Sequence, residues 1–236
     1  MSENIKKITK AFKVDLDSRE NQNILKPSTR PFNHQAHQVN EAAKKIAEKI
    51  YNLIEGTKHS NDDIILNHNE IKEAFFSPFK PQLKNAQVFL SHSHADKNKA
   101  LKVKNYLEED LDAECVFIDS LFWDYKDNIV KEMSKYDNTS KIEDAFTLIL
   151  RESLQNMIEK CPYFVFLQSN NSVSDQGLSR ITYSAWIYEE LKIAHSIRES
   201  RPTPMMESWQ VFHDVSPFLE NLETITLKEL SQQINS

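Results

Sequence analysis

The sequence predicts an α/β protein with a central parallel sheet, helices on both faces of that sheet and a small helical N-terminal segment. Three short apolar runs rich in β-forming residues carry this prediction: AQVFL at 86–90, CVFID at 115–119 and YFVFLQS at 163–169. Helical patterns separate these runs. Strands that alternate with helices are typical of parallel sheets that are covered on both faces.

The first 83 residues are predicted to form an N-terminal arm and a helical segment outside the main domain. Residues 1–34 are polar, slightly basic and interrupted by prolines, so we expect a poorly ordered arm. Residues 36–55 repeat apolar positions with the spacing of an amphipathic helix, and Gly56 stands where a C-terminal cap belongs. A second short helix, within NHNEIKEAFFSP, is expected to end before Pro78.

Residues 84–236 are predicted to form the main domain. The first strand leads into a helix over 95–111, which has apolar residues on one face. Asp96, Asn98 and Lys99 are expected to form the N-cap region and solvated face of this helix. The later elements are expected in this order: a polar segment at 120–142, a helix with inward residues from Phe146 to Ile158, a helix at 184–197, strands at 209–215 or 222–226, and a last helix at 227–234.

Composition excludes several classes of protein. The net charge of −6 argues against a nucleic-acid binder, and no run of 18 apolar residues predicts a transmembrane helix. Only 2 glycines are present, so neither a dinucleotide-binding GxGxxG loop nor a P-loop can be built. Cys115 and Cys161 lie in apolar runs and are expected to be reduced core residues of a cytoplasmic protein.

Polar residues follow each of the three predicted strands. SHSHAD spans 91–96, DSLFWDY spans 119–125 and QSNNS spans 168–172. Ligands of open parallel sheets bind at the carboxyl ends of the strands, so the functional site is expected there. His92 and His94 have no third ligand near them in the sequence, and we predict no metal site.

The helix SAWIYEELKIAHSI, at 184–197, holds two adjacent glutamates that differ in position around the helix. With Trp186 set at zero, Glu190 falls at about 40°, near the middle of the apolar stripe. Glu189 falls with Lys192 on the opposite, polar side and is expected to face water. A carboxylate in an apolar stripe is unfavourable unless it is paired, hydrogen-bonded or lining a cavity. Glu190 is therefore the candidate functional carboxylate.

Four short motifs, in this order, resemble the Toll/interleukin-1 receptor (TIR) domain family over about residues 84–236. VFLSHSHADK is similar to the family's first strand and loop, and CVFIDSLFW to its second strand with a terminal acid. YFVFLQSNNSVS is similar to a later strand, and SAWIYEEL to the family's Ser-x-Trp-x-x-x-Glu-Leu helix start. The resemblance implies a flavodoxin-like TIR fold, and the closest likeness is to bacterial TIR-like proteins of anti-phage defence.

The resemblance also implies a site for NAD. In catalytic TIR domains, a glutamate four residues after the helix Trp cleaves the nicotinamide–ribose bond, and here that residue is Glu190, four after Trp186. Ser91, His92 and Asp119 match residues of the substrate pocket. Trp123 lies in a loop that can stack on nicotinamide or meet a neighbouring subunit. Nicotinamide leaves as a neutral base from a cationic ring, and a carboxylate can stabilise the oxocarbenium-like ribose.

The expected function is thus an NAD hydrolase or ADP-ribosyl cyclase, with NAD as substrate and no cofactor. The expected partners are further copies of the chain, through TIR contacts, and a separate effector that responds to the product. Two alternatives stay open at this point. One is a non-catalytic TIR interaction module, and the other is a deoxyribosyltransferase-like enzyme that forms a covalent intermediate on its glutamate.

Overall fold

The computed structural model describes residues 10–25, 52, 72–73, 84–111, 115–120, 131, 139–176, 179–196 and 213–235. The chain divides into two compact units. Residues 1–30, 85–119 and 155–236 form one unit, and residues 31–84 and 120–154 form the other. The central sheet lies in the first unit.

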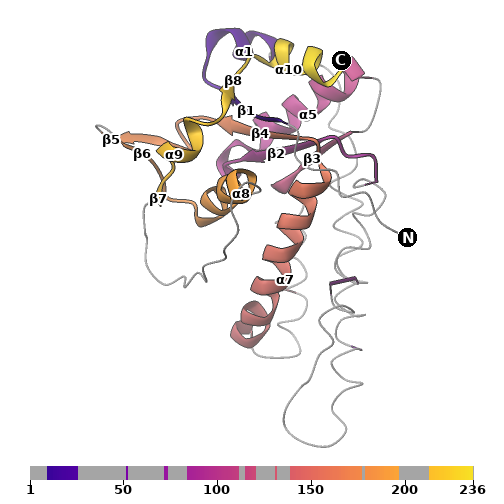
Figure 1. Ribbon diagram of the computed structural model, residues 1–236, viewed down its shortest axis with the longest axis vertical. Coiled ribbons are helices and arrows are strands. Elements are labelled where there is room, and N and C mark those ends of the chain that lie inside the picture. The colour runs from indigo at the N-terminus through magenta and orange to yellow at the C-terminus, as the bar shows by residue number, and fades with distance from the viewer. Residues whose placement is uncertain are drawn as a thin grey trace, which may run out of the picture. The chain divides into compact units, whose positions relative to one another are not determined.

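The central sheet has five strands in the order β3-β2-β4-β1-β8 (Figure 1). All four strand pairs are parallel. The strands are β1 (Lys10–Asp15), β2 (Val88–His92), β3 (Val116–Ile118), β4 (Tyr163–Gln168) and β8 (Glu223–Thr224). The predicted strands at 86–90, 115–119 and 163–169 are confirmed as β2, β3 and β4, and with them the α/β class of the fold.

Strand β1 corrects the expectation of an N-terminal arm. Its six residues pair with all of β4, from Lys10 beside Tyr163 to Asp15 beside Gln168, and β8 pairs with its other edge. Phe12 and Val14 are buried at 1% and 0% exposure. The interpretation of residues 1–34 as an arm is therefore wrong for these residues, which form an interior strand of the sheet.

Helices cover both faces of the sheet, as predicted. In Figure 1, α1 (Arg19–Ile24), α5 (Lys97–Leu111) and α10 (Leu227–Ile234) lie on one face, and α8 (Ala185–Ser196) lies on the other. Three further helices with described bounds are η1 (His94–Asp96), α7 (Thr139–Lys160) and α9 (Ser216–Leu219). No helix in the described ranges has both the length and the apolar character needed to cross a membrane.

A second sheet, absent from the sequence prediction, lies beside α8. Its strands β5 (Ser174–Gln176), β6 (Ser179–Thr182) and β7 (His213–Asp214) are antiparallel. The strand expected within 209–215 is β7, and the one expected within 222–226 is β8. The helix expected over 95–111 is observed as η1 followed by α5, and the last helix is confirmed over 227–234. The helices expected over 36–55 and before Pro78 fall almost entirely outside the described residues.

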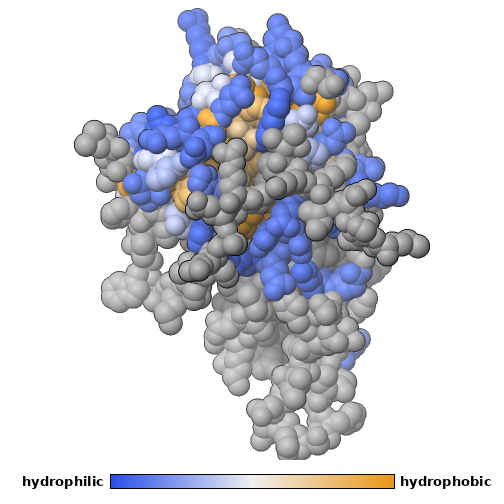
Figure 2. Space-filling model, in the orientation of Figure 1, coloured by the Kyte–Doolittle hydropathy of each residue, from blue (hydrophilic) through white to orange (hydrophobic). Residues whose placement is uncertain are grey.

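The core of the first unit is built on alternating strand residues. On the α8 face, the rings of Phe89 and Phe117 are 5.9 Å apart, and so are those of Phe89 and Phe164. On the other face, Tyr163 donates from its hydroxyl to the carbonyl of Gln233 in α10. The described residues on the side seen in Figure 2 are mostly hydrophilic, which fits an apolar core enclosed by these layers.

Candidate functional site

The carboxyl end of β2 supplies two polar side chains to two different clusters. Ser91 and His92 are neighbours in an extended strand, so their side chains point to opposite faces of the sheet. Their contacts agree, because Ser91 bonds to α8 while His92 pairs with Asp119, the residue after β3. Sequence reasoning placed both side chains in one pocket, and the structure assigns them to adjacent clusters at one edge.

The first cluster is the pair formed by Ser91 and Glu190. The hydroxyl of Ser91 donates to Oε2 of Glu190 over 2.5 Å, and both residues are 0% exposed. Helix α8 is started by Ser184, whose Oγ accepts from the amide of Ile187. This cap sets the helix so that Glu190 faces the end of β2. The prediction that Glu190 is a buried, partnered carboxylate is confirmed.

The prediction for Glu189 is wrong, because this residue is only 2% exposed. On the side of α8 that was expected to face water, α9 packs against Tyr188 and His195. The ring of Phe218 lies 5.5 Å from the ring of Tyr188 and 5.5 Å from that of His195. Helix α8 therefore carries two buried glutamates, and burial alone does not distinguish Glu190 from its neighbour.

The second cluster begins with His92 and Asp119. Nδ1 of His92 lies 2.5 Å from Oδ1 of Asp119, and the two residues are 3% and 4% exposed. Burial lowers the pKa of His92, but the Asp119 carboxylate, with smaller contributions from Asp96 and the Leu90 carbonyl, outweighs it. The net result is a pKa raised above the usual 6.5, which favours the protonated imidazole beside a buried carboxylate.

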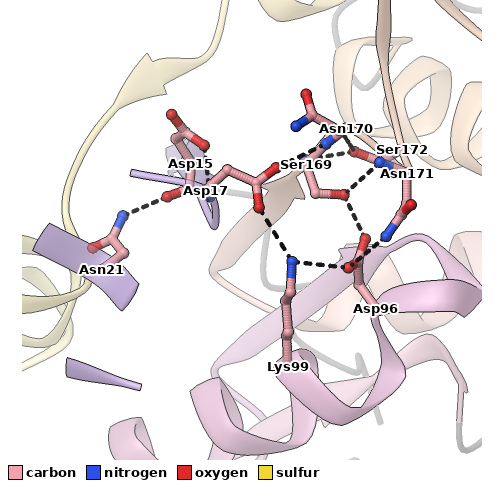
Figure 3. Close-up of polar contacts among 9 residues, drawn as sticks. All are labelled: Asp15, Asp17, Asn21, Asp96, Lys99, Ser169, Asn170, Asn171 and Ser172. Carbon is pink, nitrogen blue, oxygen red and sulfur yellow. Dashed lines mark hydrogen bonds and ion pairs between the residues drawn. The ribbon is translucent and has the colours of Figure 1, made fainter. Parts of the chain in front are cut away.

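Asp96 continues this cluster toward β4 and was expected to lie on a solvated helix start. It is 2% exposed, so that expectation is wrong. Its Oδ2 accepts a hydrogen bond from the Ser169 hydroxyl, and its Oδ1 accepts one from the Asn171 side chain over 3.0 Å (Figure 3). The predicted meeting of the strand ends 91–96 and 168–172 is confirmed by these contacts.

Lys99 and Asp17 extend the cluster to the end of β1. Nζ of Lys99 lies 3.3 Å from Oδ1 of Asp96 and 3.2 Å from Oδ1 of Asp17 (Figure 3). The amide of Asn170 donates to Oδ2 of Asp17 over 3.0 Å. This hydrogen bond is the main reason why the pKa of Asp17 is lowered; burial opposes the shift and Lys99 adds to it. Sequence reasoning missed Asp17, because it lay in the supposed arm.

The structure says little about the substrate-binding role predicted for the two tryptophans, Trp186 and Trp123. Trp186 is the second residue of α8 and is half-buried. Trp123 lies outside the described residues. Within the described ranges, no three His, Cys, Asp or Glu side chains are grouped so that they could hold a metal ion.

The chemistry available at this edge is that of buried carboxylates. Asp96, Asp119 and Glu190 are all buried, and the imidazole of His92 lies against Asp119. Such an edge favours groups that carry or develop positive charge. Comparison with protein-family models, with curated proteins and with solved structures gave no match.

Proposed function

We propose that the protein is an NAD-processing enzyme of the TIR type, which cleaves the nicotinamide–ribose bond with Glu190 as the essential carboxylate. The single observation that carries the proposal is the 2.5 Å hydrogen bond from Ser91 to the fully buried Glu190, at the carboxyl end of the sheet. Two motifs that were matched to the TIR pocket independently, one after a strand and one on a helix, thus supply side chains that touch.

The proposed role of Glu190 is electrostatic. Cleavage gives the ribose an oxocarbenium character, and a carboxylate near the ring stabilises that charge or orients the ribose hydroxyls. Ser91 fixes one oxygen of the carboxylate, so the group needs little reorganisation during the reaction. Water, or a hydroxyl of the same or another molecule, then attacks the anomeric carbon of the ribose. The identity of this nucleophile determines whether the product is linear or cyclic.

The buried charges at this edge support the same reaction. The carboxyl groups of Asp96, Asp119 and Glu190 are all buried at this edge, and low local polarity strengthens the effect of a carboxylate on a nearby cation. The pyridinium of NAD is positive before cleavage, and the ribose becomes positive during it. Asp119 and His92 belong to this edge, although His92 does not share a cluster with Ser91.

The alternative is a non-catalytic TIR interaction module. One observation is compatible with this alternative: the Ser91–Glu190 hydrogen bond joins α8 to β2, and it would stabilise the fold even in a protein that catalyses no reaction. Assembly through TIR contacts belongs to both proposals. A separate effector that responds to the product, and a place in bacterial anti-phage defence, belong only to the enzyme.

The test is incubation of the purified full chain with NAD, with chromatography of nicotinamide, ADP-ribose and cyclic products. Protein concentration is varied over a hundredfold range, because a site completed by a second copy would give specific activity that rises with concentration. We expect nicotinamide release in at least the concentrated samples. Absence of release at every concentration, from protein shown to be folded and self-associated, would favour the interaction module.

A further inference from the structure

The charged residues of the second cluster alternate in sign along the carboxyl edge of the sheet. We propose that this row holds the turn after β4, residues 169–172, against the edge, and that His92 makes the hold sensitive to pH. We call the row the edge charge row; its members, in order from β3 to β1, are Asp119, His92, Asp96, Lys99 and Asp17.

Each link of the edge charge row joins opposite charges. Asp119 lies 2.5 Å from the His92 ring, and the charge of Asp96 adds a smaller contribution that raises the pKa of the same ring. Lys99 then bridges Asp96 and Asp17 at 3.3 and 3.2 Å. The row thereby connects residues at the ends of β3, β2 and β1 with the start of α5. Figure 3 shows the part of the row that Asp96, Lys99 and Asp17 form.

The turn is attached to the carboxylates of this row. Asp96 accepts from the side chains of Ser169 and Asn171, and Asp17 accepts from the amide of Asn170. The turn also bonds to itself, through the amide of Ser169 and the hydroxyl of Ser172 at 2.8 Å. Its position against α5 and β1 therefore depends on two ionised carboxylates, which must remain balanced by cations.

His92 is the member whose charge changes near neutral pH. The charged groups that act on it are Asp119, which follows β3 and contacts the ring, and Asp96 on η1, which also raises its pKa; Lys99 of α5 is paired with Asp96. Strand β4 has no ionisable acid or base besides the phenol of Tyr163 at its far end, and Glu190 of α8 is bonded to Ser91 on the opposite face. Loss of the His92 proton leaves two buried carboxylates facing a neutral ring, so the hold on Asp96 and on the turn should weaken.

The experiment is a pH titration of the isotopically labelled full chain, followed by NMR. The His92 ring nitrogens report its charge, and the backbone amides of Asn170 and Asn171 report the turn. We expect His92 to titrate above the usual 6.5, and the two amide signals to move with the same midpoint. Asp119→Asn should lower both midpoints together by about one to three pH units. His94→Gln, at an exposed position of the same loop, should leave them unchanged.

Lys99→Met is a second variant, at a more exposed position. It allows the proposal to be tested even if Asp119→Asn does not fold. It removes the link to Asp17, and the response of Asn170 should shrink while that of Asn171 stays. The proposal would be overturned if the amide signals of Asn170 and Asn171 did not shift as His92 titrates. It would also be overturned if the His92 ring were neutral at pH 6. No NAD is present, so the result does not depend on the proposed reaction.

Discussion

Ser91, at the end of β2, donates a hydrogen bond of 2.5 Å to Glu190, which lies on α8 and 99 residues later in the chain. Both residues are fully buried. A buried carboxylate is strongly unfavourable without such a donor, so the bond fixes α8 against the sheet and presents Glu190 at the edge where ligands of parallel sheets bind.

Ser91→Ala should lower the free energy of unfolding by about 1.5–3 kcal/mol, because it removes a buried hydrogen bond to a charged group. Urea denaturation at neutral pH measures this change. Ser93→Ala is the matched control, since Ser93 makes no side-chain capping bond and lies two residues further along. Equal losses in the two variants would show that the Ser91–Glu190 bond has no special value.

Phe12→Ala should lower the free energy of unfolding by about 3–5 kcal/mol, as expected for a large side chain removed from a core. The reason is that Phe12 is 1% exposed in a strand paired on both edges. Lys10→Ala, in the same strand but exposed, should change it by less than about 0.5 kcal/mol. A small effect at Phe12 would restore the interpretation of this segment as an arm.

The ion pair of His92 and Asp119 predicts the sign of a pH effect on stability. The pKa of His92 is raised in the folded chain, so its protonated form adds stability that is complete below the unfolded value of about 6.5. That contribution is lost as the pH rises through the folded pKa. Unfolding curves of wild type and His92→Gln, taken from pH 5.5 to 9, should therefore converge at the alkaline end. Curves that diverge there would contradict the raised pKa.

Sequence patterns predicted β2, β3 and β4 because each is a short apolar run between helical patterns. Strand β1 carried its own signal, since Phe12, Val14 and Leu16 alternate with Lys13 and Asp15 in the period of two that a strand requires. The prolines and the polar residues around this run suggested an arm instead. Its place between β4 and β8 depends on pairings more than a hundred residues away, which no local pattern contains.

The position of a candidate site residue was predictable where it depends on the pattern of a single helix or strand. Glu190 followed from the period of a single helix, and Asp119 from its position at a strand end. Glu189 did not, because the period of α8 alone does not show which other elements pack against its polar side. Asp96 was misplaced for a similar reason: its burial comes from Ser169 and Asn171, which belong to a turn far away in the sequence.

The most direct test of the central claim compares nicotinamide release by wild type, Glu190→Gln and Glu189→Gln at one high protein concentration. The two variants make the same chemical change at neighbouring buried positions, so both replace a buried carboxyl group by an amide. If Glu190 is the working carboxylate, its variant should lose activity by about a hundredfold or more, and the Glu189 variant should keep most of it. Full activity in folded Glu190→Gln would contradict the claim, and so would equal losses in the two variants.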